Sequence, residues 1–310
     1  MSVHGEAATA ADEFRRSWKI ILVAAVGLGA GLSALPIYSI GVLTKPLTTA
    51  FGISRGDVQS VYTWMTIGNL IASPLLGIAI DRIGVRKITL ISVALMSIGM
   101  AAMSLAESLW HLYFIGFVMS VVGVGTVPIT WTRVIVDWFS KGRGFALGLA
   151  LAGTGIAAVF LPMYTTWLVA NFTWRGAYVG IACLPALLAL PLSYFLLHDR
   201  TGGTKTEAPR AGEQKEAEFG EVLKGYRFWV MIVAFFLVGA CVAGLISALV
   251  PILTDRGVAP GTAAGVASVI GMMVIVSRIG TGFLLDRFWA PGVALFLLSI
   301  PAVEIGRAHV

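Results

Sequence analysis

Long apolar segments separated by short polar stretches are the feature that most limits how this chain can fold. A helix needs roughly 20 apolar residues to cross about 30 Å of hydrocarbon, and eight segments are long enough, with part of a ninth. The predicted spans are 18–43, 58–80, 88–106, 109–136, 145–170, 176–197, 228–253, 263–285 and 290–303. Charged residues make up only 12% of the chain, about half their usual share in soluble domains. Too few charges remain to cover a soluble globule, so the sequence predicts an all-α, multi-pass membrane protein.

The distribution of lysine and arginine predicts which ends of the spans face the cytoplasm, because cytoplasmic loops are enriched in these residues. With the N-terminus placed inside, 15 basic residues fall in cytoplasmic segments and 4 in outer loops. The outer four are Lys45, Arg55, Arg175 and Arg256. We therefore expect a cytoplasmic N-terminus in a plasma or inner membrane. The basic residues lie between apolar blocks rather than on one polar face, which argues against nucleic acid as a partner.

One long polar segment divides the chain. Residues 198–227 mix Lys, Glu, Gly and Pro and contain almost no apolar residues before Phe219, a composition typical of a linker. The expected domains are a cytoplasmic tail at 1–17, a six-helix bundle at 18–197, the cytoplasmic linker at 198–227 and a partial second bundle at 228–303.

A short element recurs in the two halves. Asp81-Arg82 follows the second predicted span and Asp286-Arg287 follows the eighth, 205 residues later. In each copy a glycine precedes the aspartate by four residues, at Gly77 and Gly282. Six spans with their loops need about this length, so the pattern indicates an internal repeat of the kind found in transporters.

The first copy resembles the loop between helices 2 and 3 of the major facilitator superfamily. The matching residues are Gly77, Asp81, Arg82, Gly84, Arg86 and Lys87. The stretch 138–148 is similar to the helix 4–5 loop of the same family. The resemblance implies two helix bundles around a central cavity. It also implies a loop that acts as a conformational latch, whose aspartate faces a helix N-terminus of the other half and pairs with basic residues. The sequence departs from the family pattern at Ala79 and Val85, and the second copy lacks the following glycine and basic pair.

The resemblance also implies that sequence is missing. The family has twelve spans, so we expect a C-terminally truncated fragment that lacks helices 9–12 and does not transport on its own. Residues 304–310 are expected to be a non-native tail, because one choice of codons for them spells a short sequencing adapter.

Arg278 lies inside the eighth predicted span, eight residues before Asp286. A cation in hydrocarbon costs about 2.5–3.5 kcal/mol on insertion scales, so its head must reach an interface or a polar cavity. In the first case Arg278 snorkels or pairs with another helix. In the second it binds an anion, because a guanidinium matches a carboxylate with two hydrogen bonds.

A second resemblance favours the anion-binding interpretation. The stretch 38–55 looks like the oxalate/formate antiporter and monocarboxylate porter branch of the superfamily. In that branch an arginine of helix 8 is thought to bind the substrate carboxylate, and Arg278 lies at the matching place. The animal monocarboxylate porters carry an aspartate one turn earlier, where this chain has Val274.

Other polar or aromatic residues inside the spans either line the same cavity or serve packing. They are Tyr38, Asn69, Trp131 and Tyr164. No carboxylate inside a span offers an obvious proton relay, so coupling to a proton or to a counter-substrate stays open. Four scattered histidines include no pair at ligand spacing, and we expect no metal and no cofactor. Cys183 and Cys241 lie in apolar runs and are expected to be buried and unpaired.

These features favour a secondary active transporter of a small organic anion, a monocarboxylate or dicarboxylate, that works by alternating access in the lipid bilayer and is monomeric at full length. One alternative is efflux of drugs or hydrophobic compounds, although the positive charge of Arg278 would repel a cation. Another is a non-transporting receptor or scaffold on the same fold, because fold does not determine function. The sequence contains no Walker A motif, so we expect neither an enzyme nor an ATP-driven pump.

Overall fold

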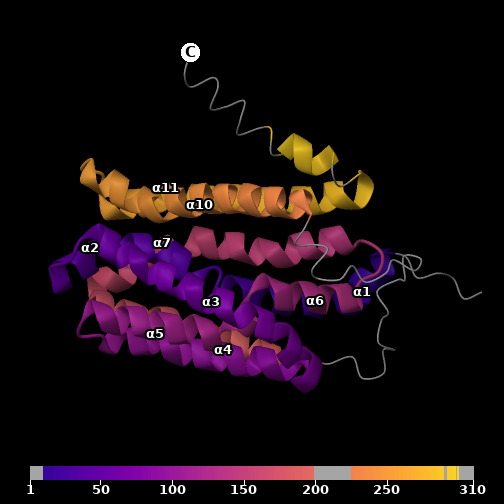
Figure 1. The fold of residues 1–310 in the computed structure, drawn as a ribbon, viewed down its shortest axis with the longest axis horizontal. Helices are drawn as coiled ribbons and strands as arrows, with labels where there is room; N and C mark the ends of the chain where they lie inside the picture. The colour runs from indigo at the N-terminus through magenta and orange to yellow at the C-terminus, as the bar shows by residue number, and fades with distance from the viewer. Residues whose placement is uncertain (1–9, 199–224, 290–291, 298, 300–310) are drawn as a thin grey trace, which may run out of the picture.

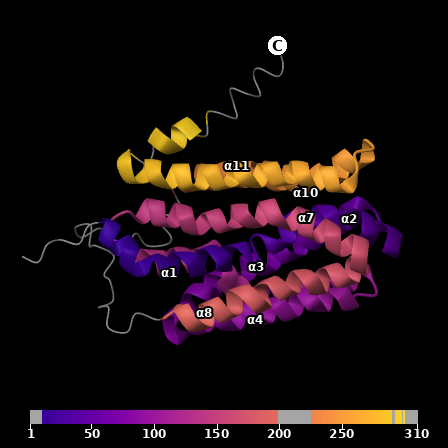
Figure 2. The same cartoon turned by 180° about the vertical axis from the view of Figure 1, so that it is seen from behind.

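The computed structural model describes residues 10–198, 225–289, 292–297 and 299, and the regular structure in this part of the chain is helical throughout. Figures 1 and 2 show long helices lying side by side and roughly parallel. The first half contains α1 (Ala10–Gly29), α2 (Leu35–Phe51), α3 (Arg55–Ile83), α4 (Val85–Ala102), η1 (Met103–Leu105), α5 (Leu109–Val122), η2 (Val124–Thr126), α6 (Pro128–Trp138), α7 (Arg143–Leu184), η3 (Pro185–Ala189) and α8 (Leu190–Leu196). The second half contains α10 (Tyr226–Asp255) and α11 (Pro260–Arg287), followed by helical residues at 292–297.

Five described helical segments are long and apolar enough to cross a membrane. They are Arg55–Ile83, Val85–Leu105, Arg143–Leu196, Phe228–Asp255 and Pro260–Arg287. Leu109–Val122 is a shorter apolar helix. The count of eight complete spans stays a prediction. Half of the predicted ninth span, nearly all of the linker and the whole tail at 304–310 lie outside the described residues.

Two predicted spans are interrupted, and their interruptions meet. The first span, 18–43, bends between α1 and α2, and the fourth, 109–136, breaks at η2. The backbone N–H of Leu32 donates to Oγ1 of Thr126 at 3.0 Å. Backbone groups released from a helix in a membrane need such partners, so each break helps to satisfy the other. The periodicity of apolar residues did not reveal either break.

Local sequence explains where several helices start and stop. Ser54 and Asp57 form a capping box at the start of α3, each side chain accepting a hydrogen bond from the backbone N–H of the other. Gly52 ends α2 at a φ of 65°, in the left-handed region that favours glycine. Within α7 the helix reverses at Thr173, where φ is 63° and ψ is 179°. This residue lies between the fifth and sixth predicted spans, so α7 contains two helices.

The second half packs on one side of the first. In Figure 1, α10 and α11 form a layer above α7 and α2, while α4 and α5 lie on the far side. Contacts join α11 to α7 and α10 to α2. The bundle has two ends, which we name by a residue at each. The Asp286 end is the one at which α3, α6 and α11 terminate, and the Arg55 end is the one at which α2 and α10 terminate. Both Asp-Arg turns lie at the Asp286 end, as the repeat predicts.

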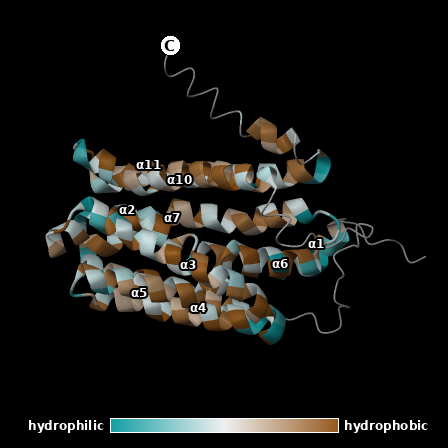
Figure 3. Cartoon of the chain, in the orientation of Figure 1, coloured by the Kyte–Doolittle hydropathy of each residue, from teal (hydrophilic) through white to brown (hydrophobic). Residues whose placement is uncertain are grey.

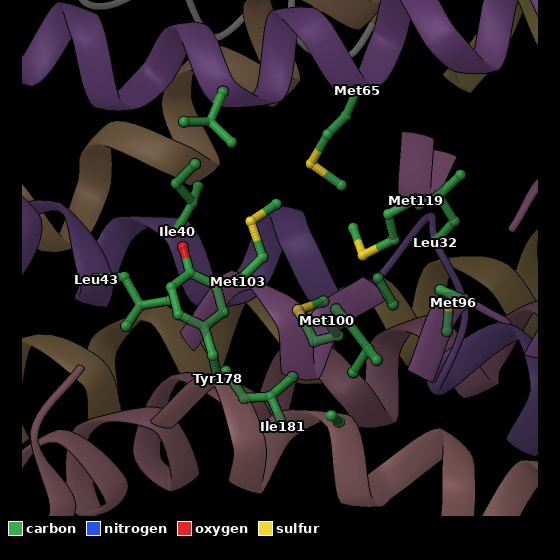
Figure 4. Close-up of a cluster of buried hydrophobic side chains, with 14 of the residues drawn as sticks. Leu32, Ile40, Leu43, Met65, Met96, Met100, Met103, Met119, Tyr178 and Ile181 are labelled. Carbon is green, nitrogen blue, oxygen red and sulfur yellow. The ribbon is translucent and has the colours of Figure 1, made fainter. Parts of the chain in front are cut away.

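A cluster of methionines forms much of the buried core of the first half (Figure 4). Its members come from α3, α4, η1 and α5 and are Met65, Met96, Met100, Met103 and Met119. Tyr178 and Ile181 of α7 close the cluster on one side. Unbranched methionine side chains fill irregular gaps between helices, so these helices can pack closely despite their differing tilts.

The outer surface of the bundle is strongly apolar. Hydrophobic residues cover the middle of the helices and polar residues gather at their ends (Figure 3). Cys183 and Cys241 are both free, as expected, but both are exposed, so the prediction that they are buried is wrong. In a membrane bundle apolar side chains also face outward, because lipid rather than water surrounds them.

Small residues let α7 and α11 approach closely. A Cβ atom on Gly148 would lie 2.6 Å from the carbonyl oxygen of Arg278, and one on Gly144 would lie 2.7 Å from that of Gly282. Both distances are too short for a carbon atom, so these positions require glycine. Close backbone approach through small residues is how helices associate in lipid, and here it joins the two halves.

Candidate functional site

Arg278 and Tyr38, which belong to different halves, lie close enough for their side chains to interact electrostatically. Arg278 lies on α11, and its backbone carbonyl packs against α7 at Gly148. Tyr38 lies on α2, half-buried, with Pro162 of α7 and Ile270 of α11 nearby. Arg278, whose side chain is exposed, and Tyr38 therefore lie within electrostatic range of each other across the two halves.

Tyr62 belongs to the same group, although the sequence analysis did not single it out. It lies near Tyr38, and with Asn69 it lines a cavity of about 100 Å³. The amide oxygen of Asn69 accepts a hydrogen bond from Ser73 at 3.3 Å. A tyrosine inside a predicted span was the only sequence signal for Tyr62. Phenol and amide groups can donate hydrogen bonds to a polar ligand.

Two other predicted cavity residues serve the packing of the first half. Trp131 is 1% exposed, and its indole N–H donates to the carbonyl of Thr126 at 3.2 Å. The hydroxyl of Tyr164 donates to the carbonyl of Gly180 at 3.2 Å, within α7. Of the two alternatives given above for these residues, the contacts of Trp131 and Tyr164 favour packing.

The second copy of the Asp-Arg element joins the two halves at the Asp286 end. The carboxylate of Asp286, on α11, accepts hydrogen bonds from the backbone N–H groups of Gly144 and Phe145, each at 2.7 Å. These N–H groups open α7, whose N-cap residue, Gly142, has no side chain to cap them. A carboxylate at a helix N-terminus is favoured by the helix dipole, so Asp286 caps a helix of the other half.

The first copy makes a different contact in the described part of the chain. Asp81 of α3 pairs with Arg133 of α6, within the first half. The expected contact with a helix N-terminus of the other half is therefore made by Asp286, and the expected pairing with a basic residue is made by Asp81. The two copies share a glycine and the Asp-Arg pair at the same spacing, but the helices beside them differ.

The remaining loop residues shape the turn after α3. Gly84 has a φ of 95°, which favours glycine at this position. The guanidinium of Arg86 donates to the carbonyl of Tyr194 at 2.7 Å and lies 5.7 Å from the centre of its ring, which ties the turn to α8. A Cβ on Gly77 would meet nothing within 4 Å. The exposed side chains are Arg82, Lys87 and Arg287.

The polar groups linked in this way are the guanidinium of Arg278 and the phenols of Tyr38 and Tyr62, and the amide of Asn69 lies beside Tyr62 in a cavity lined by first-half residues. Such groups bind an anion by charge and by hydrogen bonds. Among the residues that the structure describes, no group of three His, Cys, Asp or Glu side chains is placed to hold a metal ion.

A sequence model of the Major Facilitator Superfamily matches residues 26–303, most of the chain. The chain belongs to the major facilitator superfamily. It is therefore an all-α, multi-pass membrane protein.

Several curated members of the superfamily resemble this chain. Monocarboxylate transporter 11 of Mus musculus is 27% identical over 275 residues, covering 88% of this chain and 61% of the relative. Monocarboxylate transporter 4 of Mus musculus is 25% identical over 256 residues, covering 79% and 53%. The oxalate:formate antiporter of Oxalobacter formigenes is 28% identical over 230 residues, covering 72% and 53%. These matches confirm the resemblance to this branch, and the chain spans about half to three fifths of the relatives' length.

Proposed function

We propose that this major facilitator protein is part of a secondary active transporter of a small organic anion, a monocarboxylate or dicarboxylate, and that Arg278 binds the carboxylate. The position of Arg278 on α11, with its backbone packed against Gly148 of the other half and its charge within electrostatic range of Tyr38, supports this proposal. A guanidinium between two apolar half-bundles attracts an anion, and a neighbouring phenol can donate a hydrogen bond to it. The names of the relatives support the same class of substrate.

We propose eight complete spans and part of a ninth, arranged as a first bundle at 18–197 and a second at 228–303. The N-terminus faces the cytoplasm, and the protein lies in a plasma or inner membrane. The basic residues predicted to be cytoplasmic include Lys19, Lys141 and Arg287, which the structure has at the Asp286 end. The Asp286 end is then cytoplasmic and the Arg55 end is outside.

Alternating access requires contacts between the two halves that form in one of the two transport conformations and are absent in the other. The cap that Asp286 places on α7 joins the halves at the cytoplasmic end. Such a contact favours the closed conformation of that end by its own free energy. Opening toward the cytoplasm requires that the cap be broken, whereas the Asp81–Arg133 pair can stay intact because it lies within one half.

Equilibrium binding of labelled carboxylates to the protein in lipid nanodiscs tests the role of Arg278. Arg278→Ala should weaken binding about ten- to a hundredfold, because charge-assisted hydrogen bonds contribute about 1.5–3 kcal/mol. Arg278→Lys keeps the charge but loses the planar fork, so its binding should lie between Arg278→Ala and the unchanged protein. The matched control is Arg256→Gln, which removes an exposed cation at the Arg55 end. If Arg278→Ala binds carboxylates as tightly as the unchanged protein, at normal expression, Arg278 is not the anion site. If the unchanged protein instead prefers lipophilic cations to carboxylates, efflux of hydrophobic compounds is favoured.

A further inference from the structure

An apolar cavity lies in the first half, between α1, α7 and η3. Its volume is about 290 Å³, and every residue that lines it is apolar. None of these residues belongs to the second half, and Figure 2 shows α1 between α7 and α8 on this side of the bundle. We call this cavity the α1 groove, and the residues that line it include Leu22, Gly29, Ile156, Phe160 and Leu188.

The shape of the α1 groove comes from small residues with larger ones around them. A Cβ on Gly29 would lie 2.6 Å from the carbonyl oxygen of Gly153, so the backbones of α1 and α7 meet here without side chains between them. Ile156 and Leu188 are 58% and 50% exposed, so the groove opens on the surface of the bundle. Leu188 lies in the π-helical turn η3, and such turns are rare and are often found at functional sites.

An exposed stripe of α1 leads from the groove toward the Asp286 end. At 3.6 residues per turn, Arg15, Trp18 and Lys19 lie on the face of α1 that carries Leu22, and all four side chains are exposed. In the described part of the chain neither Arg15 nor Lys19 forms an ion pair. Arg16 is also exposed, but it is rotated about 100° from Arg15. Two cations therefore lie in line with an apolar groove.

The length of this stripe matches the depth of one leaflet of a bilayer. Arg15 and Gly29 are 14 residues apart, which is about 21 Å of helix at 1.5 Å per residue. A bilayer with its headgroup regions is about 40–45 Å thick, so one leaflet is about 20–22 Å. Tryptophan is enriched at the level of the headgroups, and Trp18 lies beside Lys19. Asp12 precedes Arg15 by three residues and is therefore further from the groove. The cations are then at the height of lipid phosphates and the groove is at the height of acyl chains.

We propose that the α1 groove and the two cations above it form a binding site for an anionic phospholipid. The headgroup phosphate lies at Arg15 and Lys19, and one acyl chain follows α1 into the groove against Ile156 and Leu188. In the proposed orientation this lipid belongs to the cytoplasmic leaflet, whose surface carries anionic lipids. The inference does not depend on Arg278 or on the transported substrate.

Native mass spectrometry of the 310-residue protein released from lipid nanodiscs tests this site. The nanodiscs contain equal amounts of phosphatidylglycerol and phosphatidylcholine with identical acyl chains, so only the headgroups differ. A basic side chain near the membrane surface favours an anionic lipid about fivefold. The unchanged protein should therefore retain phosphatidylglycerol in preference to phosphatidylcholine by about 25-fold, and Arg15→Gln or Lys19→Gln should each lower this preference about fivefold.

Matched variants separate the headgroup from the acyl chain. Arg16→Gln removes an exposed cation of α1 that lies outside the stripe, so it should leave the preference nearly unchanged. Leu188→Ala should lower the retained amounts of both lipids by the same factor, because both lose the same contact with the acyl chain. Leu187→Ala is its control and should change neither amount, since Leu187 also lies in η3 but is 70% exposed and does not line the groove.

Three results would overturn the inference. Equal retention of the two lipids by the unchanged protein would show that the headgroup charge is not recognised. Equal losses of preference in Arg15→Gln and Arg16→Gln would show a general attraction to basic residues rather than a site. Displacement of bound phosphatidylglycerol by soluble glycerol phosphate would show that the groove takes no part. Arg278→Ala should leave lipid retention unchanged, so this inference and the proposed function can fail separately.

Discussion

Replacing Asp286 with alanine should open the bundle at the Asp286 end. The substitution removes the acceptor of two hydrogen bonds, which the backbone N–H groups of Gly144 and Phe145 donate to the Asp286 carboxylate at 2.7 Å. Loss of a side-chain N-cap costs about 0.5–2 kcal/mol. Because this cap joins the two halves, the same free energy shifts the ratio of open to closed conformations about two- to thirtyfold toward open.

Asp286→Ala has opposite expected effects if Asp286 acts across the two halves and if it acts only within its own helix. Asp286 lies in the last turn of its own helix, α11, where a negative charge is unfavourable to the helix dipole by about 0.3–1 kcal/mol. If the contact with α7 were unimportant, Asp286→Ala would stabilise α11 and leave the halves in place. The cap across the halves predicts the opposite result, namely separation of the two helices.

Electron paramagnetic resonance distances between two spin labels measure this separation. One label replaces Lys19 on α1 and the other replaces Trp289 after α11, both exposed, in a background where Cys183 and Cys241 are changed to serine. Asp286→Ala should broaden the distance distribution and move it to longer values.

The control for this experiment removes a carboxylate cap that lies within one half. Glu13 of α1 accepts hydrogen bonds from the backbone N–H groups of Ser140 and Lys141, at 3.1 and 2.8 Å. Glu13→Gln weakens a cap on the same connection between α6 and α7, but it should not change the distance between the halves. A distribution for Asp286→Ala that coincides with that of the unchanged protein would refute the reasoning.

Two further predictions concern packing and pH. Gly148→Ala should lower the unfolding temperature, because its Cβ would lie 2.6 Å from the carbonyl oxygen of Arg278 and such overpacking costs about 1–3 kcal/mol. The control, Gly77→Ala, places a Cβ that meets nothing within 4 Å, so it should leave the unfolding temperature unchanged or raise it. Equal changes of the unfolding temperature in the two variants would contradict the prediction. Slight burial alone would raise the pKa of the Glu13 carboxyl, but its hydrogen bonds, first that from the Ser140 hydroxyl, outweigh it and lower the pKa. The contribution of Glu13 is therefore complete above its ordinary value of 4.5 and is lost as the pH falls through the lowered value. Hydrogen exchange of the Ser140 amide checks this: protection should persist at pH 4.5 and fall below it, and loss of protection already above that pH would contradict the prediction.

Much of the candidate site followed from single residues in unusual surroundings. Arg278 stood out because a cation inside an apolar span is costly, and the structure has its charge beside Tyr38. Tyr62 and Trp131 show why the rest did not follow. Both are aromatic residues in predicted spans, yet Tyr62 lies near Tyr38 whereas Trp131 is fully buried. The face of a helix that lines a cavity depends on the helices packed around it. In a soluble protein apolar residues mark the buried face, but in a membrane the lipid-facing side is apolar as well, so the periodicity of apolar residues does not identify the buried face.

The sequence by itself determined the all-helical membrane class and the repeated Asp-Arg element, because hydropathy and motif spacing depend only on order along the chain. The tertiary structure alone decided what each aspartate contacts. Asp81 meets Arg133, 52 residues away, whereas Asp286 meets Gly144, 142 residues away. The physical reason is that a carboxylate takes whichever donor the neighbouring helices bring within hydrogen-bond distance, and at these sequence separations only helix packing brings the donors there.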